Sequence, residues 1–242
     1  MKKSVSPGEL MIIIPAYNEA GAVGGVVREV RQILPEAPVL VIDDCSTDNT
    51  VTTARGAGAE VLLLPHHLGL GGCVQAGYRL AWELGYQYVI RVDGDGQHDP
   101  ADIPRILAAL RNGGPQMVIG SRYLSGAAPP TSWVRGLGIR FFRLVLRPIL
   151  GQRVSDPTSG FVGVNREALQ VFSRSFPLEY PEIEALVVLQ RRAFRFVEVP
   201  CQSRPRRAGK SSITAMKSFY YILHVLLGVI VNILKIGGRH GR

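Results

Sequence analysis

Between residues 10 and 120 the sequence alternates short apolar runs with longer segments whose apolar residues have the spacing of amphipathic helices. Strands that are separated by helices form parallel sheets, so this alternation predicts an α/β fold around a mainly parallel sheet flanked by helices. The expected strands are residues 11–14, 39–42, 61–64, 88–92 and 117–120. The expected helices are residues 19–34, 48–57, 70–84 and 101–111. Asp99 is placed to cap the last helix, because Pro100 follows it.

Clusters of polar residues follow three of the expected strands, at residues 15–19, 43–50 and 93–99. Open α/β sheets bind their ligands beyond the carboxyl ends of the strands. We therefore expect these clusters to meet in one crevice.

The run VDGDGQHDP contains Asp93 and Asp95 on either side of a glycine, directly after an expected strand. Two carboxylates at this spacing can approach one hard divalent cation, and Gln97 can add an oxygen ligand or orient a water molecule. The same run is also typical of an acidic β-turn that binds nothing. Taken alone, the run leaves both interpretations open.

A second acidic pair, Asp43 and Asp44, follows another expected strand. These carboxylates can accept hydrogen bonds from a ribose or a base. The alternative is capping of the next helix, for which Ser46 or Asp48 is the expected N-cap. Capping explains Asp48 better than it explains Asp43.

The chain has a formal net charge of +9, which favours an anionic partner. Residues 1–121 carry 9 basic and 13 acidic side chains, whereas residues 122–242 carry 19 basic and 6 acidic ones. The first half can therefore hold a cation and the second an anion. The basic residues accompany long apolar segments and no exposed aromatic platform, so we expect no nucleic-acid partner.

The cysteines Cys45, Cys73 and Cys201 are odd in number and form no CxxC pair. This pattern predicts a reduced, cytoplasmic setting. The apolar run at residues 10–14 is interrupted by Pro15 and lacks the features of a signal peptide, so we expect no export signal.

The C-terminal region has membrane-like features. Residues 217 and 235 are lysines separated by 17 uncharged, mostly apolar residues, within an expected helix at residues 211–236. A narrow polar stripe on this helix favours a position in the membrane interface. A true span and packing against an integral membrane partner or a second copy are the alternatives. Upstream, Arg140, Arg143 and Arg147 predict a basic amphipathic helix after a break at residues 126–131.

Five motifs occur in the order found in inverting family 2 glycosyltransferases with the GT-A fold, which this chain resembles. They are IIPAYNE (13–19), VIDDCSTDNT (41–50), HLGLGG (67–72), VDGDGQHDP (92–100) and GSRY (120–123). DPTSGF (156–161) and EVP with RRAGKSS (198–212) resemble the branch that makes polyprenyl-phosphate sugars, such as dolichol-phosphate mannose synthases. The resemblance runs from residue 12 to about residue 213 and implies a Rossmann-like sheet.

The resemblance also implies functional residues. Those that hold the nucleotide sugar would be Pro15, Tyr17, Glu19, Asp43, Asp44 and Asp93. Mg²⁺ or Mn²⁺ on the donor diphosphate would be bound by Asp93, Asp95 and Gln97. The polyprenyl-phosphate acceptor would contact Arg122, Arg135, Ser159, Gly160, Arg206 and Lys210. Asp95, Arg122 and Arg206 are the expected catalytic residues.

Two departures from the family pattern concern single residues. His67 stands where the family usually has asparagine, and the expected catalytic base is replaced by YPEIEAL, which offers Glu182 or Glu184. We assign neither glutamate as the base. A phosphate monoester is already anionic near neutral pH, so a polyprenyl-phosphate acceptor needs cationic positioning groups in place of a strong base.

These features predict a hexosyltransferase of the polyprenyl-phosphate type at the cytoplasmic face of the cell membrane, with UDP-glucose or GDP-mannose as donor. Residues 1–210 would form the catalytic domain, with a nucleotide-sugar half (1–121) and an acceptor half (122–210), and residues 211–242 the membrane-associated helix and basic tail. Two alternatives stay open: a polysaccharide-extending transferase with a hydroxyl acceptor, and a noncatalytic sugar-nucleotide sensor. A dinucleotide-binding fingerprint is excluded, since Val74 stands where its third glycine belongs.

Overall fold

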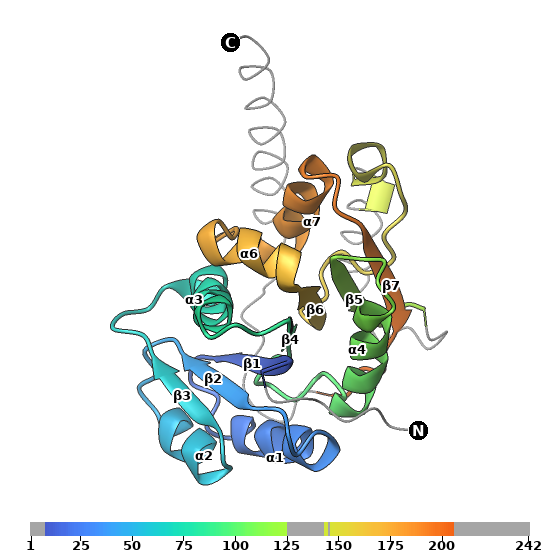
Figure 1. Cartoon of the computed structure of the whole chain (residues 1–242). Helices are drawn as coiled ribbons and strands as arrows, with labels where there is room; N and C mark the ends of the chain where they lie inside the picture. The colour runs from blue at the N-terminus through green and yellow to red at the C-terminus, as the bar shows by residue number, and fades with distance from the viewer. Residues whose placement is uncertain (1–7, 125–142, 145, 206–242) are drawn as a thin grey trace.

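The computed structural model describes residues 8–124, 143–144 and 146–205. Its centre is a seven-stranded sheet with the strand order β3-β2-β1-β4-β6-β5-β7 (Figure 1). The strands are β1 (Leu10–Ala16), β2 (Val39–Asp43), β3 (Glu60–Leu63), β4 (Tyr88–Arg91), β5 (Met117–Ser121), β6 (Val162–Asn165) and β7 (Phe196–Pro200). β6 is antiparallel to β4 and β5, and the other pairings are parallel. The predicted α/β fold with a mainly parallel sheet is confirmed.

Helices cover both faces of this sheet. They are α1 (Val23–Ile33), α2 (Thr50–Gly56), α3 (Gly69–Glu83), α4 (Ile103–Arg111), α6 (Arg166–Arg174) and α7 (Pro181–Arg191), with a 3₁₀ turn η1 (Pro100–Asp102) before α4. Residues 143–144 and 146–150 are also helical. The helix predicted from residue 19 begins at Val23, because Glu19 is held in the preceding loop. The Glu19 backbone N–H donates to Thr50 Oγ1 at 2.8 Å, and the Glu19 carbonyl accepts hydrogen bonds from the N–H groups of Ala22 and Val23.

The two capping predictions have different outcomes. Asp99 is the N-cap of η1, the turn that opens the predicted helical segment, and its side chain accepts a hydrogen bond from the Ala101 N–H at 3.0 Å, whereas the cap position of α4 itself is Asp102. The prediction of Ser46 or Asp48 as the N-cap of α2 is wrong, since the cap position is Asn49. Asp48 nevertheless accepts a hydrogen bond from the Thr50 N–H at 2.9 Å, so it binds the first turn from one residue further back.

The core has two layers, one on each face of the sheet. Leu10, Ile12 and Ile14 of β1 pack toward α1 and α4, whereas Met11 and Ile13 pack toward α3, α6 and α7. A strand covered on both faces is apolar at every position, which explains the uninterrupted apolar run of β1.

Strands β6 and β7 and helix α6 were not expected from the apolar pattern. The two strands complete the same sheet, so strands from both sides of residue 121 share it. Within the described ranges, none of the helices has the length and apolar content needed to cross a membrane. The expected C-terminal helix at residues 211–236 lies beyond these ranges.

The predicted basic helix is described in part. Arg147 is exposed, but Arg143 donates from Nε to the Ser155 carbonyl at 2.8 Å and lies over the Tyr123 ring, 4.7 Å from its centroid. Arg143 therefore binds the protein and does not form a solvent-facing basic row with Arg147. Arg140 is outside the described residues.

Candidate active site

The predicted polar clusters meet at one edge of the sheet. The loops after β1, β2, β4 and β5 leave the carboxyl ends of parallel strands and so reach the same edge. Because β6 is antiparallel, its amino end lies at this edge, and residues 156–161 arrive there as well. The antiparallel strand is thus the reason that the DPTSGF motif can join the site.

Hydrogen bonds of Asn18 hold the first two loops together. Asn18 Oδ1 accepts a hydrogen bond from the Thr47 N–H at 2.8 Å, and the Asn18 N–H donates to Ser46 Oγ at 2.9 Å. Asn18 and Cys45 have φ values of 54° and 66°, in the left-handed region. The Asn, Ser and Thr residues of YNE and DCSTDNT are the local signal that could have indicated this contact.

The acidic pair of the second loop is buried, with both residues 3% exposed. Asp43 Oδ2 accepts a hydrogen bond from the Ser46 N–H at 3.1 Å, while Asp43 Oδ1 has no hydrogen-bond partner within the described part of the chain. A buried carboxylate oxygen of this kind is suited to accept a hydrogen bond from a ligand. Asp44 is bound more fully, by the Leu68 N–H at 2.7 Å and by His67 Nδ1 at 2.9 Å.

The remaining residues of the predicted nucleotide site surround this pair. The ring of Tyr17 lies against that of His67, with 4.4 Å between centroids, and Tyr17 is 46% exposed. Tyr17 therefore presents a ring face beside the buried carboxylates. Pro15 contributes its backbone, since its carbonyl lies 3.2 Å from where a Cβ of Gly94 would be, so the two loops approach closely.

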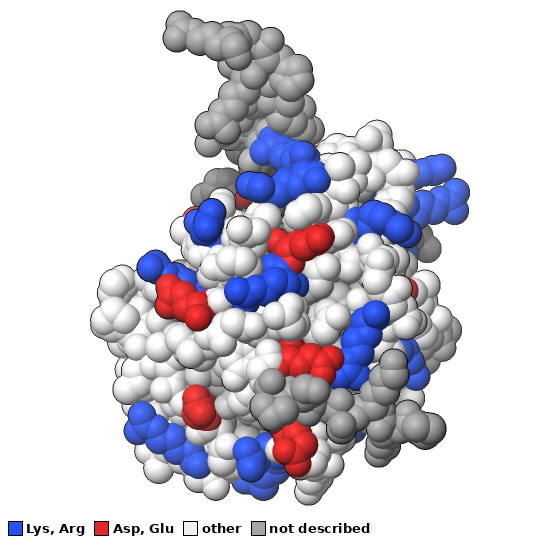
Figure 2. Space-filling view, viewed as in Figure 1, with Lys and Arg blue, Asp and Glu red and all other residues white. Residues whose placement is uncertain are grey.

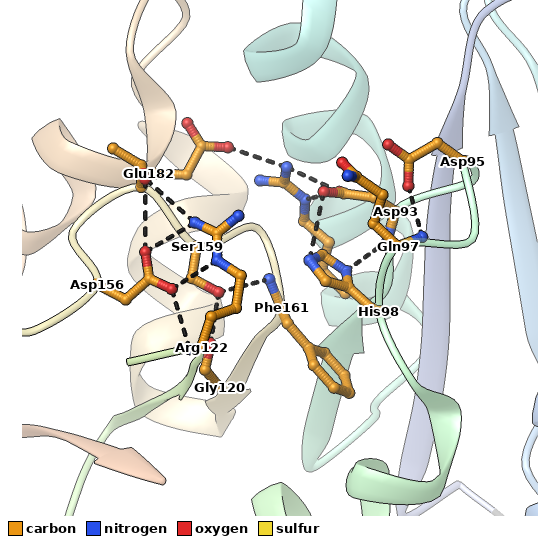
Figure 3. A network of polar contacts seen from close by, with 12 residues as sticks. Asp93, Asp95, Gln97, His98, Gly120, Arg122, Asp156, Ser159, Phe161 and Glu182 are labelled. Atoms are coloured by element: carbon orange, nitrogen blue, oxygen red, sulfur yellow. Dashed lines mark hydrogen bonds and ion pairs between the residues drawn. The ribbon is translucent and has the colours of Figure 1, made fainter. Parts of the chain in front are cut away.

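The loop after β4 carries the predicted metal ligands (Figure 3). Asp93 Oδ1 accepts hydrogen bonds from Nε and Nη2 of Arg91 at 3.1 and 2.9 Å. Burial is the largest single effect and would raise the pKa of Asp93, but the charge and hydrogen bond of Arg91, together with the charges of His98 and Arg122, bring this pKa below its usual value. Asp95 is 7% exposed and accepts a hydrogen bond from the Gln97 N–H at 2.9 Å. The turn needs glycine at Gly96, where φ is 76°.

His98 closes this loop. The Asp93 N–H donates to His98 Nδ1 at 3.2 Å, and the imidazole stacks on Phe161 with 5.0 Å between ring centroids. Burial lowers the pKa of His98, so the ring is neutral at pH 7 and Nδ1 can act as an acceptor.

The oxygen atoms of this loop fit Mg²⁺ or Mn²⁺. These cations prefer oxygen ligands, which Asp93, Asp95 and the Gln97 amide provide. The described residues contain no group of three or more His, Cys, Asp or Glu side chains placed to bind a metal. Two carboxylates are nevertheless enough for a cation that enters with a diphosphate, because Mg²⁺ is commonly bound by one or two carboxylates together with substrate phosphates.

On the opposite side of the site, Arg122 is fixed by Asp156. Nε and Nη2 of Arg122 donate to the two oxygens of Asp156 at 2.7 and 2.8 Å, and the Arg122 N–H donates to the same carboxylate at 3.1 Å. Glu198 of β7 in turn accepts hydrogen bonds from the N–H groups of Ser155 and Asp156 at 2.7 and 2.8 Å. Arg122 is therefore a preorganised cation, and Asp156 and Glu198 are supporting residues that the sequence analysis did not identify.

Ser159 and Gly160, predicted in the acceptor pocket, are both buried, and Figure 3 shows Ser159 beside Arg122 and Asp156. Ser159 is 3% exposed, and its hydroxyl donates to the Gly120 carbonyl at 2.6 Å. A Cβ at Gly160 would lie 2.5 Å from Asp93 Oδ2, so a larger residue would displace that carboxylate. In this structure both residues bring the acceptor-side loop against the β4 loop.

Arg135, Arg206 and Lys210 lie outside the described ranges, but the segment leading to Arg206 is well placed. Ser203 forms an antiparallel bridge with His98, and the Arg204 N–H donates to the Gln97 carbonyl at 2.8 Å. The Arg204 guanidinium also pairs with Glu29 and Asp99, at 2.7 Å each. Residues 203–204 therefore run directly beside the predicted metal loop.

The two candidate glutamates of α7 have different surroundings. Glu182 Oε1 lies 2.9 Å from Arg91 Nη2, at the site. Glu184 has a pKa that burial raises above its usual value, and its N–H donates to the Tyr180 carbonyl at 3.0 Å. Glu182 is thus the glutamate of this pair that the structure joins to the β4 loop.

The family model described as "Glycosyl transferase family 2" matches residues 11–172, which is more than half of the chain. The chain belongs to glycosyl transferase family 2. The resemblance found in the sequence motifs is confirmed.

Relatives of this glycosyltransferase include enzymes named for lipid-phosphate acceptors. An undecaprenyl-phosphate mannosyltransferase of Micrococcus luteus is 32% identical over 219 residues, which cover 85% of this chain and 87% of that protein. A UDP-N-acetylglucosamine–dolichyl-phosphate N-acetylglucosaminyltransferase of Methanococcus voltae is 27% identical over 250 residues, which cover 92% of this chain and 98% of that protein.

Solved structures of similar fold include a glucosyl-3-phosphoglycerate synthase from Mycobacterium tuberculosis in complex with Mn²⁺, UDP-glucose and phosphoglyceric acid. It is 25% identical, has a TM-score of 0.64, and the match covers 82% of this glycosyltransferase and 72% of that chain. The similarity to these structures therefore supports the GT-A fold that the resemblance implied.

Proposed function

We propose that this glycosyltransferase moves a hexose from a nucleotide sugar to a polyprenyl phosphate, with inversion at the anomeric carbon. The observation that carries the proposal is the chemistry of the acceptor side. It holds a fixed cation, Arg122, and the segment leading to Arg206, while the nearby carboxylate of Glu182 is engaged by Arg91. A hydroxyl acceptor must lose a proton as it attacks, whereas a phosphate monoester is already an anion and needs cations to position it.

The donor side provides complementary groups. Asp43 Oδ1 is a buried acceptor for a ribose or base donor, and the exposed ring of Tyr17 lies against His67, which binds the neighbouring Asp44. Mg²⁺ or Mn²⁺, when bound by Asp93, Asp95 and Gln97, would act as a Lewis acid that stabilises the leaving diphosphate. Arg122 then lies across the site from these carboxylates and can keep a second anion close to the first (Figure 3).

The relatives support the acceptor class, since the two named above carry a polyprenyl phosphate in their names. Their sugars differ, so the donor has to be found by experiment, and UDP-glucose, GDP-mannose and UDP-N-acetylglucosamine are the first to test.

We place the reaction at the cytoplasmic face of the membrane. Exposed basic side chains of the acceptor half lie on the segment at residues 147–153, at the ends of α6 and α7 and in the turn before β7, and Figure 2 shows basic side chains on this part of the surface. They include Arg147, Arg153, Arg174, Arg191, Arg192 and Arg195. Basic residues at a surface are attracted to anionic lipids. Together with the apolar C-terminal segment at residues 211–236, this surface would bring the site to the polyprenyl chain.

The test is nucleotide release from a panel of UDP- and GDP-sugars, with Mg²⁺ or Mn²⁺, in the presence of a short polyprenyl phosphate. The matched control is the polyprenol without its phosphate. We expect release from one donor that requires both the metal and the lipid phosphate. Release that proceeds equally with the polyprenol would indicate a hydroxyl acceptor, and donor binding without release under any condition would indicate a sensor. Either result would overturn the proposal.

A further inference from the structure

Arg91 is a deeply buried cation between two carboxylates from different parts of the chain. It ends β4, and its side chain is only 4% exposed. Its guanidinium binds Asp93 Oδ1 from the following loop at 2.9 Å and Glu182 Oε1 from the first turn of α7 at 2.9 Å. In Figure 3, dashed lines join Asp93 and Glu182 to the guanidinium that lies between them.

The burial of Arg91 explains why it has two partners. A guanidinium removed from water is stable in a protein only when carboxylates and hydrogen bonds compensate for its lost solvation. Asp93 and Glu182 supply the two carboxylates that this compensation requires. The three side chains therefore form one interdependent unit.

The loop at residues 158–161 closes over this unit. A Cβ at Gly160 would lie 2.6 Å from Arg91 Nη2 and 2.5 Å from Asp93 Oδ2. The absence of a side chain at Gly160 lets the backbone cover the ion pair directly. The position of Arg91 is thus set from three directions, by β4, by α7 and by this loop.

The arrangement leaves Asp93 with two unlike oxygens. Oδ1 takes both hydrogen bonds from Arg91, whereas Oδ2 lies 3.7 Å from His98 Nε2, and the side chain is 30% exposed. A carboxylate held through one oxygen presents the other in a defined direction. Residues that orient metal ligands in this way commonly change metal affinity or activity about 10–100-fold when they are replaced.

Glu182 pairs through one oxygen with the buried cation. Its side chain is 13% exposed, and Oε1 is engaged by Arg91 Nη2. A base must have an oxygen aimed at the proton that it removes. Glu182 Oε1 instead contacts the buried guanidinium of Arg91.

We propose that Arg91 is a positioning residue that aims Asp93 at the donor diphosphate and its metal, and that Glu182 is the counter-ion of Arg91 and not a general base. The inference rests on the metal and the nucleotide of the proposed function, but not on its acceptor. It also assigns α7, in the acceptor half, a direct influence on a donor ligand.

The first test compares two replacements of Glu182, by glutamine and by leucine. The Glu182→Gln variant keeps an oxygen that accepts from Arg91, whereas the Glu182→Leu variant does not. The dissociation constant of Mn²⁺ in the presence of UDP is measured from the electron paramagnetic resonance signal of free Mn²⁺. We expect Glu182→Gln, which keeps the hydrogen bond but loses the charge, to bind Mn²⁺ with an affinity between those of wild type and Glu182→Leu, and Glu182→Leu to bind Mn²⁺ about 10–100-fold more weakly than wild type, with kcat following the same order.

A general base would produce the opposite pattern. Both variants would then bind Mn²⁺ and UDP like the wild type, and both would lose about 10²–10⁴-fold in kcat. That result would overturn the inference. Glu184→Gln on the same helix is the matched control, and it should leave the Mn²⁺ dissociation constant unchanged.

The second test replaces the cation itself. Arg91→Met preserves much of the length of the side chain and removes its charge, and we expect Mn²⁺ to bind at least about 10-fold more weakly in the presence of UDP. Arg79→Met removes an exposed pair with Glu83 and serves as the control that should match wild type. If Arg91→Met fails to fold, the two Glu182 variants decide the question.

The outcomes separate this inference from the proposed function. Arg91→Met and Glu182→Leu proteins that bind Mn²⁺ and UDP like the wild type would overturn the inference alone. A wild-type protein that binds no Mn²⁺ in the presence of UDP would overturn the metal assignment and the inference together.

Discussion

Replacement of Asp156 by asparagine tests whether Arg122 depends on its buried partner. The Asp156 side chain is 0% exposed, and its oxygens bind Nε and Nη2 of Arg122 at 2.7 and 2.8 Å. Asparagine keeps one acceptor oxygen but loses the charge and the second acceptor. Hydrogen bonds to charged groups contribute about 1.5–3 kcal/mol each, so the free energy of unfolding should fall by about 2 kcal/mol. For a chain of this size that corresponds to a Tm decrease of about 4–8 °C.

The kinetic consequence should be confined to one substrate. With Arg122 less firmly oriented, we expect KM for polyprenyl phosphate to rise about 10-fold, equivalent to about 1.4 kcal/mol, while KM for the nucleotide sugar stays within about 3-fold. Steady-state kinetics with each substrate varied in turn give both values, and thermal unfolding gives Tm.

A matched ion pair distant from the site separates stability from function. Glu9 and Arg111 lie 2.7 Å apart and are 21% and 19% exposed, at the opposite end of β1. Glu9→Gln should lower Tm slightly and leave both KM values unchanged. The reasoning about Arg122 is refuted if Asp156→Asn leaves KM for the lipid phosphate unchanged, or raises KM for the nucleotide sugar as much as KM for the lipid.

Three further predictions concern other parts of the chain. Asp95→Ala should reduce turnover at least about 100-fold while thermal unfolding stays close to wild type, and wild-type turnover would show that the metal assignment is wrong. Burial raises the pKa of Cys73 and of Cys201 to about 12, from about 9 for an ordinary thiol. Native thiols therefore keep protons that unfolded thiols lose, and the free energy of unfolding should fall between about pH 9 and 12, by up to about 1.4 kcal/mol per pH unit for each thiol. Denaturant titrations should show a shallower decline for the double variant Cys73→Ala, Cys201→Ala, and an equal decline would contradict this explanation. Deletion of residues 217–242 should release the protein from anionic vesicles in a sedimentation assay, and unchanged sedimentation would contradict the membrane-docking proposal.

The strands and helices of the first half could be predicted because their signal is local. The run at residues 11–14 is apolar throughout, and the structure buries β1 on both faces. The apolar pattern also placed the Asp93–Gln97 loop directly after an expected strand, and in the structure this loop follows β4. The later elements gave no such signal, since β6 is short and antiparallel and its run VGVN is half glycine and asparagine.

The supporting residues of the site could not be predicted because their partners are distant in sequence. Arg91 occupies an ordinary strand position in the sequence, and its role depends on Glu182 in α7. Asp156 depends in the same way on Glu198, which reaches it from β7. The sequence pattern identifies polar residues at the ends of strands. It does not identify which of them form ion pairs across elements, because those pairs form only when α7 and β7 pack against the sheet.

The most direct test of the central claim is the chemical nature of the product. The purified enzyme is incubated with its donor, Mn²⁺ and a short polyprenyl phosphate, and the lipid fraction is analysed by mass spectrometry before and after mild acid treatment. We expect a lipid heavier than the acceptor by one hexosyl residue, from which mild acid releases the sugar and regenerates the polyprenyl phosphate. An unmodified lipid phosphate in a reaction that glycosylates a hydroxyl acceptor would contradict the claim.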